Sequence, residues 1–236
     1  EKIMLCGASG SGKSTLLRLL KRELSPRGEL SGNITLMGKD RSELSDRESD
    51  EKIGFVMQSP DSQTVCDKVS AELAFGLESF GVKSGEIQSR VGEMAAFFGI
   101  EPLYDRDIST LSGGQKQLVA LCSVMATDPD ILLLDEPTAQ LDPVAARELL
   151  GILDRLNKEM GVTIIIAEHD PEELFDSCDK ILYLAKGKTE FFGTPALTAK
   201  YFVENALEGF LPENAKAFAR LCDDLPLNVR QGRAKL

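Results

Sequence analysis

Short apolar runs alternate with longer segments of helical periodicity along most of the chain. Turn residues bound each apolar run, and several runs are apolar at every position, as expected for strands covered on both faces. This alternation is typical of an α/β fold with a largely parallel sheet. Lys186-Gly187 predicts a hairpin turn between the last two strands. The predicted strands are Ile3–Cys6, Ile34–Met37, Ile53–Met57, Ile131–Leu134, Val162–Ala167, Ile181–Ala185 and Thr189–Phe192.

The longer segments repeat apolar residues every three or four positions, which predicts helices. Residues 59–128 contain such segments and no convincing strand, so we expect a helical subdomain inserted into the α/β core. The core would then comprise residues 1–58 and 129–194, with a helical extension or linker over 195–236. The predicted helices are Lys13–Glu23, Val69–Glu78, Ile87–Phe98, Gly113–Ala126, Pro143–Met160, Glu172–Ser177, Pro195–Leu207 and Pro212–Leu221.

Composition and charge exclude several classes of function. The 236 residues leave room for one large α/β domain or two small ones. The chain carries 27 Lys and Arg against 38 Asp and Glu, a net charge of −11, which argues against binding nucleic acid or an anionic bilayer directly. Its apolar runs are too short to span a membrane. The cysteines are scattered without a Cys-x-x-Cys pair, which indicates reduced thiols in the cytosol rather than zinc ligands or disulfides. They are Cys6, Cys66, Cys122, Cys178 and Cys222.

A glycine-rich loop between the first predicted strand and the first predicted helix fits the phosphate-binding pattern G-x-x-x-x-G-K-[ST]. The glycines let backbone N–H groups turn toward phosphate oxygens, and the helix N-terminus favours an anion. We expect Lys13 to reach the β- and γ-phosphates and Ser14 to bind Mg²⁺. A chance Gly/Ser-rich turn is the alternative, and the flanking strand and helix argue against it. The candidate nucleotide-binding residues are Gly7, Ser9, Gly10, Ser11, Gly12, Lys13, Ser14 and Thr15.

Two carboxylates, Asp135 and Glu136, follow the most apolar predicted strand. The carboxyl end of such a strand is where open α/β sheets bind ligands. Asp135 is the expected magnesium partner, and Glu136 can polarise a water molecule that attacks a phosphate. A strand end that meets solvent through acidic side chains is the alternative.

The run Leu111-Ser112-Gly113-Gly114-Gln115 precedes the acidic strand. Ser112 and the two glycines predict a helix start whose free N–H groups face an anion, although taken alone they also fit an ordinary N-cap. The run is the signature of ATP-binding cassette (ABC) ATPases, and the whole chain resembles one. The resemblance implies a P-loop NTPase fold of the ABC nucleotide-binding type that uses ATP and Mg²⁺. It also implies a head-to-tail dimer of two cassettes, in which the signature caps the γ-phosphate bound to the partner.

Other landmarks of that family fall in order along the chain. Gln58 closes a predicted strand as the family's Q-loop glutamine does, and there it senses magnesium and the attacking water. Asp142 matches the aspartate of the D-loop at the dimer seam. His169, the single histidine, follows a strand as the switch histidine does and would contact the γ-phosphate. The resemblance therefore implies catalytic roles for Glu136, His169 and Gln58. It implies magnesium contacts for Ser14, Gln58 and Asp135, and contacts with the partner's nucleotide for Leu111, Ser112, Gly113, Gly114, Gln115 and Asp142.

Within the superfamily, Gln58-Ser59-Pro60-Asp61-Ser62-Gln63 and Ala74–Glu78 resemble the ATPases of energy-coupling-factor (ECF) importers, which take up vitamins and transition-metal ions. Pro60–Gln63 resembles the Q-helix that faces a transmembrane coupling protein; a capped turn is the alternative. The implied partners are that coupling protein, a substrate-binding membrane subunit and a second ABC ATPase domain. The implied location is the cytoplasmic face of the cell membrane, with no nucleic acid involved.

Two positions depart from the family. Leu118 stands where an arginine usually follows the signature, and Gln140 replaces the usual glycine or alanine of the D-loop. The alternatives to an ECF-type ATPase are an ATPase of another ABC transporter class and a soluble ABC mechanoenzyme. A small-molecule kinase is excluded by the signature.

Both ends of the chain lead us to expect a longer polypeptide. In the family, early strands and an aromatic residue that stacks on adenine precede the phosphate-loop strand, which here begins at once. At the other end, Leu225–Arg233 resembles the connector before a second cassette in tandem ECF ATPases. A polar C-terminal tail is the alternative.

Overall fold

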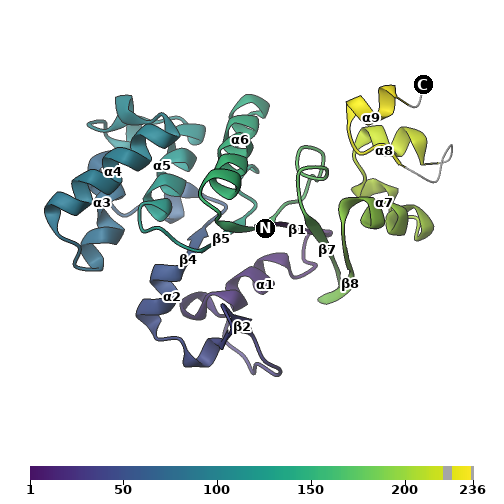
Figure 1. The fold of residues 1–236 in the computed structure, drawn as a ribbon, viewed down its shortest axis with the longest axis horizontal. Helices are drawn as coiled ribbons and strands as arrows, with labels where there is room; N and C mark the ends of the chain where they lie inside the picture. Colours follow the sequence, from purple (N-terminus) through teal and green to yellow (C-terminus); the bar gives the residue numbers. More distant parts are fainter. Residues whose placement is uncertain (220–224, 235–236) are drawn as a thin grey trace.

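A computed structural model describes residues 1–219 and 225–234. Within these residues the core is a six-stranded sheet in the order β4-β5-β6-β1-β7-β8 (Figure 1). All neighbouring strands run parallel except β7 and β8, which form an antiparallel hairpin. This confirms the predicted α/β class and largely parallel sheet. The strands are β1 (Lys2–Cys6), β4 (Ile53–Val56), β5 (Ile131–Asp135), β6 (Thr163–Ala167), β7 (Lys180–Ala185) and β8 (Lys188–Gly193).

The register brings the carboxyl ends of the central strands to one edge of the sheet. Val56 pairs with Leu134, Asp135 pairs with Ala167, and Leu5 pairs with Ala167. Leu132, Leu133 and Leu134 are fully buried because helices cover both faces of the sheet. The loops that follow these strands are thereby brought close together.

Two amphipathic helices lie on opposite sides of the sheet, α1 (Lys13–Leu20) on one and α6 (Pro143–Glu159) on the other (Figure 1). In α6 the buried residues are Leu149, Leu153 and Leu156, which recur every three or four positions and form one apolar stripe. Asp142 caps α6, and Pro143 occupies its first turn, where the missing N–H has no intrahelical partner to lose.

Three helices pack together beyond the β4 edge of the sheet (Figure 1). Glycine at position 54 lets α5 approach β4, since a Cβ there would lie 2.5 Å from a methyl group of Val124. Within residues 59–128 the structure has helices and short 3₁₀ turns, with one isolated bridge between Lys68 and Asp107. The three helices are α3 (Val69–Ser79), α4 (Ser84–Phe98) and α5 (Gly113–Met125).

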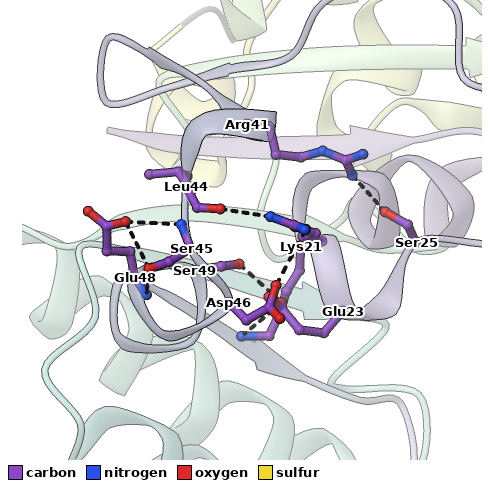
Figure 2. Close-up of polar contacts among 10 residues, drawn as sticks. Lys21, Glu23, Ser25, Arg41, Leu44, Ser45, Asp46, Glu48 and Ser49 are labelled. Carbon is purple, nitrogen blue, oxygen red and sulfur yellow. Dashed lines mark hydrogen bonds and ion pairs between the residues drawn. The ribbon is translucent and has the colours of Figure 1, made fainter.

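A small antiparallel unit of β2 (Thr35–Leu36) and β3 (Lys39–Asp40), followed by α2 (Asp46–Lys52), packs beside α1. Figure 2 shows its polar connections. Arg41 donates to the hydroxyl of Ser25 at 2.6 Å. It also donates to the carbonyl of Leu19 near the end of α1. The capping box of α2 is closed by Ser45 and Glu48. The two Arg41 bonds connect the unit to the end of α1 and to the segment that follows it.

The C-terminal extension packs on the β7–β8 hairpin through aromatic rings. Tyr201 stacks on Phe191 with ring centroids 4.5 Å apart, and Phe202 meets Tyr183 edge-to-face at 5.2 Å. Its helices are α7 (Pro195–Glu204), α8 (Glu213–Phe218) and α9 (Val229–Arg233).

Several predicted elements need correction. Glu172–Ser177 is a run of turns rather than a helix, because its N–H groups share the carbonyls of Pro171 and Leu174 instead of forming a continuous ladder. The helix predicted over Lys13–Glu23 ends at Leu20, where Lys21 turns extended and reaches the carbonyl of Ile53.

Two further differences concern the second strand and an unpredicted helix. The strand predicted over Ile34–Met37 shortens to Thr35–Leu36 and lies in the small unit instead of the main sheet. Helix α2 was not predicted, although Ser45-x-x-Glu48 is a capping-box pattern.

The free thiols of the described residues are Cys6, Cys66, Cys122 and Cys178, whereas Cys222 lies outside them. The C-terminal part of the predicted helix Pro212–Leu221 also lies outside them. In the described ranges, no helix combines the length and apolar character needed to cross a membrane.

Replacing Leu132 with alanine should lower the free energy of unfolding by about 2–5 kcal/mol, because a side chain with no solvent exposure leaves a cavity at the centre of the sheet. Leu197 is 57 % exposed and provides the matched control, for which Leu197→Ala should stay within about 0.5 kcal/mol of wild type. Urea denaturation measures both. Equal losses in the two variants would contradict the burial described here.

Candidate active site

The loop after β1 has a backbone that only glycine accommodates at its first position. Gly7 has φ +149°, and a Cβ there would lie 2.2 Å from the carbonyl oxygen of Leu184 on β7. The loop turns back through a bond from the Ser11 N–H to the Ala8 carbonyl at 3.1 Å. Gly187 then donates to the Ser11 carbonyl at 3.0 Å, which ties the loop to the β7–β8 turn.

The residues of this loop differ in their solvent exposure. Ser9, Gly10 and Thr15 are exposed, whereas Ser11 and Lys13 are buried. Lys13 is 4 % exposed, and its ammonium donates to the carbonyls of Gly7 at 2.9 Å and Ala8 at 3.4 Å. The Ser11 hydroxyl is buried and has no hydrogen-bond partner among the described residues. Because buried polar atoms are normally paired, this hydroxyl and the surrounding N–H groups fit an anionic ligand such as a phosphate.

Ser14 and Asp135 meet across the sheet edge. The Ser14 hydroxyl, in the first turn of α1, donates to Asp135 Oδ1 at the end of β5 at 2.7 Å. Asp135 is buried, and Arg18 lies 3.9 Å from its second oxygen. A hydroxyl beside a carboxylate is an oxygen donor set suited to Mg²⁺.

Glu136 lies next to two other predicted site residues. Gln58 Nε2, after β4, donates to Glu136 Oε2 at 3.0 Å, and Lys13 Nζ lies 3.7 Å from Glu136 Oε1. Three loops thus place an amide, a carboxylate and an ammonium together. Glu136 has φ +48°, a left-handed conformation that costs a non-glycine residue about 1–2 kcal/mol. Its N–H donates to the Ala167 carbonyl at 2.9 Å, which helps to hold this conformation.

Glu168 is a site residue that the sequence reasoning missed. It follows β6 and is 4 % exposed, and its Oε1 accepts both the N–H (3.2 Å) and the hydroxyl (2.7 Å) of Thr138. Burial raises the pKa of Glu168 to about 6, and the charge of Glu136 acts in the same direction, whereas the Thr138 bonds and the His169 N–H oppose it. A glutamate between a buried strand and the single histidine was the signal available in the sequence.

His169 lies one residue beyond Glu168 with an exposed side chain. In the described part of the chain, its imidazole makes no hydrogen bond to the other predicted site residues. The structure therefore brings together Lys13, Gln58 and Glu136 as one contact group and Ser14 with Asp135 as another, and leaves His169 at the rim.

The signature, Leu111–Gln115, begins α5 in the helical layer and lies against the segment that precedes α6. Ser112 Oγ accepts from the Gln115 N–H, and Gln115 Oε1 accepts from the Ser112 N–H, so the two form a capping box. A Cβ on Gly114 would lie 3.0 Å from Ala145 Cβ, and one on Gly113 would lie 3.8 Å from the Gln140 carbonyl.

Asp142 has a local structural task besides the role expected from the family. Its carboxylate accepts the N–H groups of Val144 and Ala145, and the Ala145 bond contributes most to holding the pKa of Asp142 below its usual value. Ser112 and Asp142 are both exposed, so the signature and the start of α6 can meet a partner. The S-x-x-Q spacing and the Asp-Pro pair were the sequence signals for these caps.

Residues 58–66, here the Q segment, are fixed at three points. Gln63 donates to the Phe55 carbonyl and accepts from the Met57 N–H, which extends the end of β4. The buried carboxylate of Glu72 accepts the N–H groups of Val65 and Cys66. A third link, of 2.7 Å, joins Asp61 to Lys116 in the first turn of α5.

The raised pKa of Glu168 predicts a pH-dependent difference between wild type and Glu168→Gln. Between about pH 4.5 and 6 the folded state binds more protons at this residue than the unfolded state, so its contribution falls as pH rises. Relative to Glu168→Gln, wild type should lose about 2 kcal/mol of unfolding free energy between pH 4.5 and 7.5. Urea titrations across that range measure the difference, and a difference independent of pH would contradict the burial effect.

Comparison with known sequences places the chain in a family. A family model described as ABC transporter matches residues 1–139, more than half of the chain. An ABC transporter ATP-binding protein of Bacillus thuringiensis subsp. konkukian is 41 % identical over 238 residues. That alignment covers 100 % of this chain and 43 % of the relative. An energy-coupling factor transporter ATP-binding protein of Methanospirillum hungatei is 39 % identical over 87 % of this chain and 52 % of its own length. The chain therefore spans about half the length of these relatives.

Two solved structures share the fold. The CbiO1 protein of Clostridium perfringens, described as part of an ABC transporter complex, superposes with a TM-score of 0.77 at 33 % identity and covers 100 % of this chain and 87 % of its own. A dimeric ATP-binding cassette in a post-hydrolysis state, bound to ADP and phosphate, superposes with a TM-score of 0.70 at 27 % identity. That superposition covers 83 % of this chain and 85 % of the cassette. Together with the family match and the phosphate loop facing an acidic strand end, these likenesses show that the chain belongs to the ABC transporter family of ATP-binding proteins.

Proposed function

We propose that this chain binds ATP with Mg²⁺ and hydrolyses it to drive a membrane importer of the ECF type. The observation that carries the proposal is the contact group at the sheet edge, where Gln58 and Lys13 both approach Glu136 while Ser14 bonds Asp135. These five side chains come from the start of α1, the loop after β4 and the end of β5, and the parallel sheet brings them together.

The phosphate loop and α1 would hold the nucleotide's phosphates. The loop N–H groups and the buried Ser11 hydroxyl supply donors, and Lys13 supplies the cation. Ser14, Asp135 and Gln58 are the residues that would hold Mg²⁺, which when bound neutralises charge on the phosphate oxygens.

Glu136 would act as the base toward the attacking water, and Gln58 would orient that water. The water oxygen forms a bond to the γ-phosphorus as the bond to the β–γ bridging oxygen breaks, which releases ADP and phosphate. The proton of the water passes toward the Glu136 carboxylate. His169, exposed at the rim, would contact the γ-phosphate.

A second cassette would complete the site. Ser112, Gly113 and Asp142 are exposed, whereas Leu111 is buried. We assign the signature, Leu111 to Gln115, and Asp142 to the nucleotide bound by that partner. The dimeric arrangement of one structural relative supports this assignment. Whether the second cassette is another copy, a different subunit or part of the same polypeptide follows from the mass and composition of the native complex.

The Q segment supports the ECF-type assignment. Beside it lies a groove of about 290 Å³, whose lining combines apolar side chains of β4, α3 and α5 with the charged side chains of Lys21, Asp50 and Glu72. Val65 and Phe75 on this groove are 64 % and 46 % exposed. We assign the groove to the transmembrane coupling protein of an importer for a vitamin or a transition-metal ion, which would hold the chain at the cytoplasmic face of the membrane. The likenesses to an energy-coupling factor ATP-binding protein and to CbiO1 support the choice.

Glu136→Gln in the full-length protein should leave ATP binding intact and lower turnover at this site by at least about 100-fold, because an amide keeps the shape but cannot accept the proton. Lys13→Ala should instead abolish nucleotide-dependent activity, since it removes the cation expected at the β- and γ-phosphates. Turnover and nucleotide binding are measured together in both variants and in a reference protein, and in all three the matching glutamate of any second cassette is replaced by glutamine. Normal turnover in Glu136→Gln would remove Glu136 from the catalytic role.

Phe75→Asp should weaken co-purification of the membrane partner at least about tenfold, because it replaces an exposed aromatic ring on the groove with a charge that a docked partner would have to desolvate. Phe192→Asp is the matched control, since Phe192 is 49 % exposed on β8, away from the groove. Mass spectrometry identifies the captured partners. Capture of an ABC membrane domain other than an ECF coupling protein would favour another transporter class, and no membrane partner would favour a soluble mechanoenzyme.

A further inference from the structure

We propose that Glu168 is a positioning residue for hydrolysis, which holds the turn carrying Glu136 through its two hydrogen bonds from Thr138. The inference rests on the proposed function, since it assumes that Glu136 acts on the attacking water. Glu168 acts through Thr138 and is not itself assigned any contact with reacting atoms.

The turn after β5 needs such a restraint. Glu136 has a positive φ of 48°, a conformation that side chains other than glycine rarely adopt. Such a conformation persists only where neighbouring contacts determine it. Two contacts flank this residue, both from the end of β6. The Ala167 carbonyl accepts the Glu136 N–H at 2.9 Å, and the next residue, Glu168, accepts from Thr138 two positions beyond.

The Glu168 carboxylate is itself held in place. Its own N–H donates to the Leu5 carbonyl at 3.1 Å, so its backbone continues the pairing of β6 with β1. The side chain is 4 % exposed, and one oxygen takes both Thr138 donors. A buried carboxylate that loses its hydrogen-bond donors is strongly disfavoured. The Glu168 carboxylate therefore restrains both Thr138 donors to their positions.

The connection joins two catalytic loops through one side chain. Thr138 lies two residues after Glu136, and Glu168 directly precedes His169. Glu168 therefore couples the loop of the proposed base to the loop of the proposed switch histidine. A shift in the Thr138 turn changes the direction of the Glu136 side chain, and displacements of this kind lower turnover much more than ground-state binding.

Three variants of the full-length protein test the inference. Glu168→Ala should lower kcat for ATP by about 10–100-fold while KM for ATP changes less than about threefold. Thr138→Val removes the hydroxyl donor and should lower kcat by about 3–10-fold, whereas Thr138→Ser keeps the donor and should restore wild-type kcat. The matched control is Thr198→Val, because Thr198 is buried with its hydroxyl bonded to the Thr194 carbonyl in α7. That control should retain wild-type kcat.

The double variant distinguishes positioning from a general loss of stability. If Glu168 acts through Thr138, then Thr138→Val should cost little further activity once Glu168 is alanine. Melting temperatures and nucleotide affinity confirm that each variant is folded. If Glu168→Ala fails to fold, the difference in kcat between Thr138→Val and Thr138→Ser still tests the inference.

Wild-type kcat in both Glu168→Ala and Thr138→Val would overturn the inference, as would independent, multiplicative losses in the double variant. A loss confined to KM would also overturn it. None of these results touches the proposed function, which fails instead if the wild-type protein does not hydrolyse ATP or if Lys13→Ala turns over normally.

Discussion

The arrangement of the site depends on the parallel pairing of β4, β5, β6 and β1, which brings the carboxyl ends of four strands to one edge of the sheet. The side chains that meet there come from sequence positions as far apart as 13, 58 and 136. A shift of β5 by one residue would turn Asp135 from the Ser14 hydroxyl toward the opposite face, since neighbouring side chains of a strand point to opposite sides. The contacts at this edge of the sheet therefore depend on the register in which Asp135 pairs with Ala167.

That register is fixed by burial on both faces. Leu132, Leu133 and Leu134 have no solvent exposure, so a shift that moved Asp135 into the place of Leu134 would bury a carboxylate among apolar side chains. The same burial makes every polar group at the strand ends costly unless it is paired. The bonds of Ser14 with Asp135 and of Thr138 with Glu168 satisfy this requirement. The Ser11 hydroxyl does not, which agrees with a phosphate ligand in the loop.

The Q segment connects this site with the helical layer. At one end Gln58 bonds Glu136, and further along Asp61 bonds Lys116 in the first turn of the signature helix. An exposed ion pair of this kind adds little stability, so its value lies in fixing the relative position of the two segments. The groove assigned to the membrane partner lies beside the same segment. If the membrane partner displaced the Q segment on docking, the movement would change the contacts of the chain's own nucleotide site. It would also move the signature, which we assign to the nucleotide bound by the second cassette.

Much of the fold and the family could be read from the sequence, because local signals carried them. The phosphate loop, the acidic strand end and the signature each occupy consecutive residues, and the six strands of the main sheet were predicted to within one residue at each end. The family match confirms the resemblance drawn from these runs. The catalytic roles given to Glu136, Gln58 and His169 stay predictions, as do the domain boundaries.

Where local signals were weak or conflicting, the sequence reading failed. Glu172–Ser177 looked helical, but there the packing of Leu174 and Phe175 into the core governs the backbone more than helix propensity does. Nothing local linked Glu168 to Thr138, Glu72 to the Q segment, or Asp61 to Lys116, because these partners lie 30, 6 to 7 and 55 positions apart. The sequence by itself determined which chemical groups the chain carries and the strand ends that carry them. Only the tertiary structure decided which groups meet, because those contacts depend on strand order and register, which non-local burial selects.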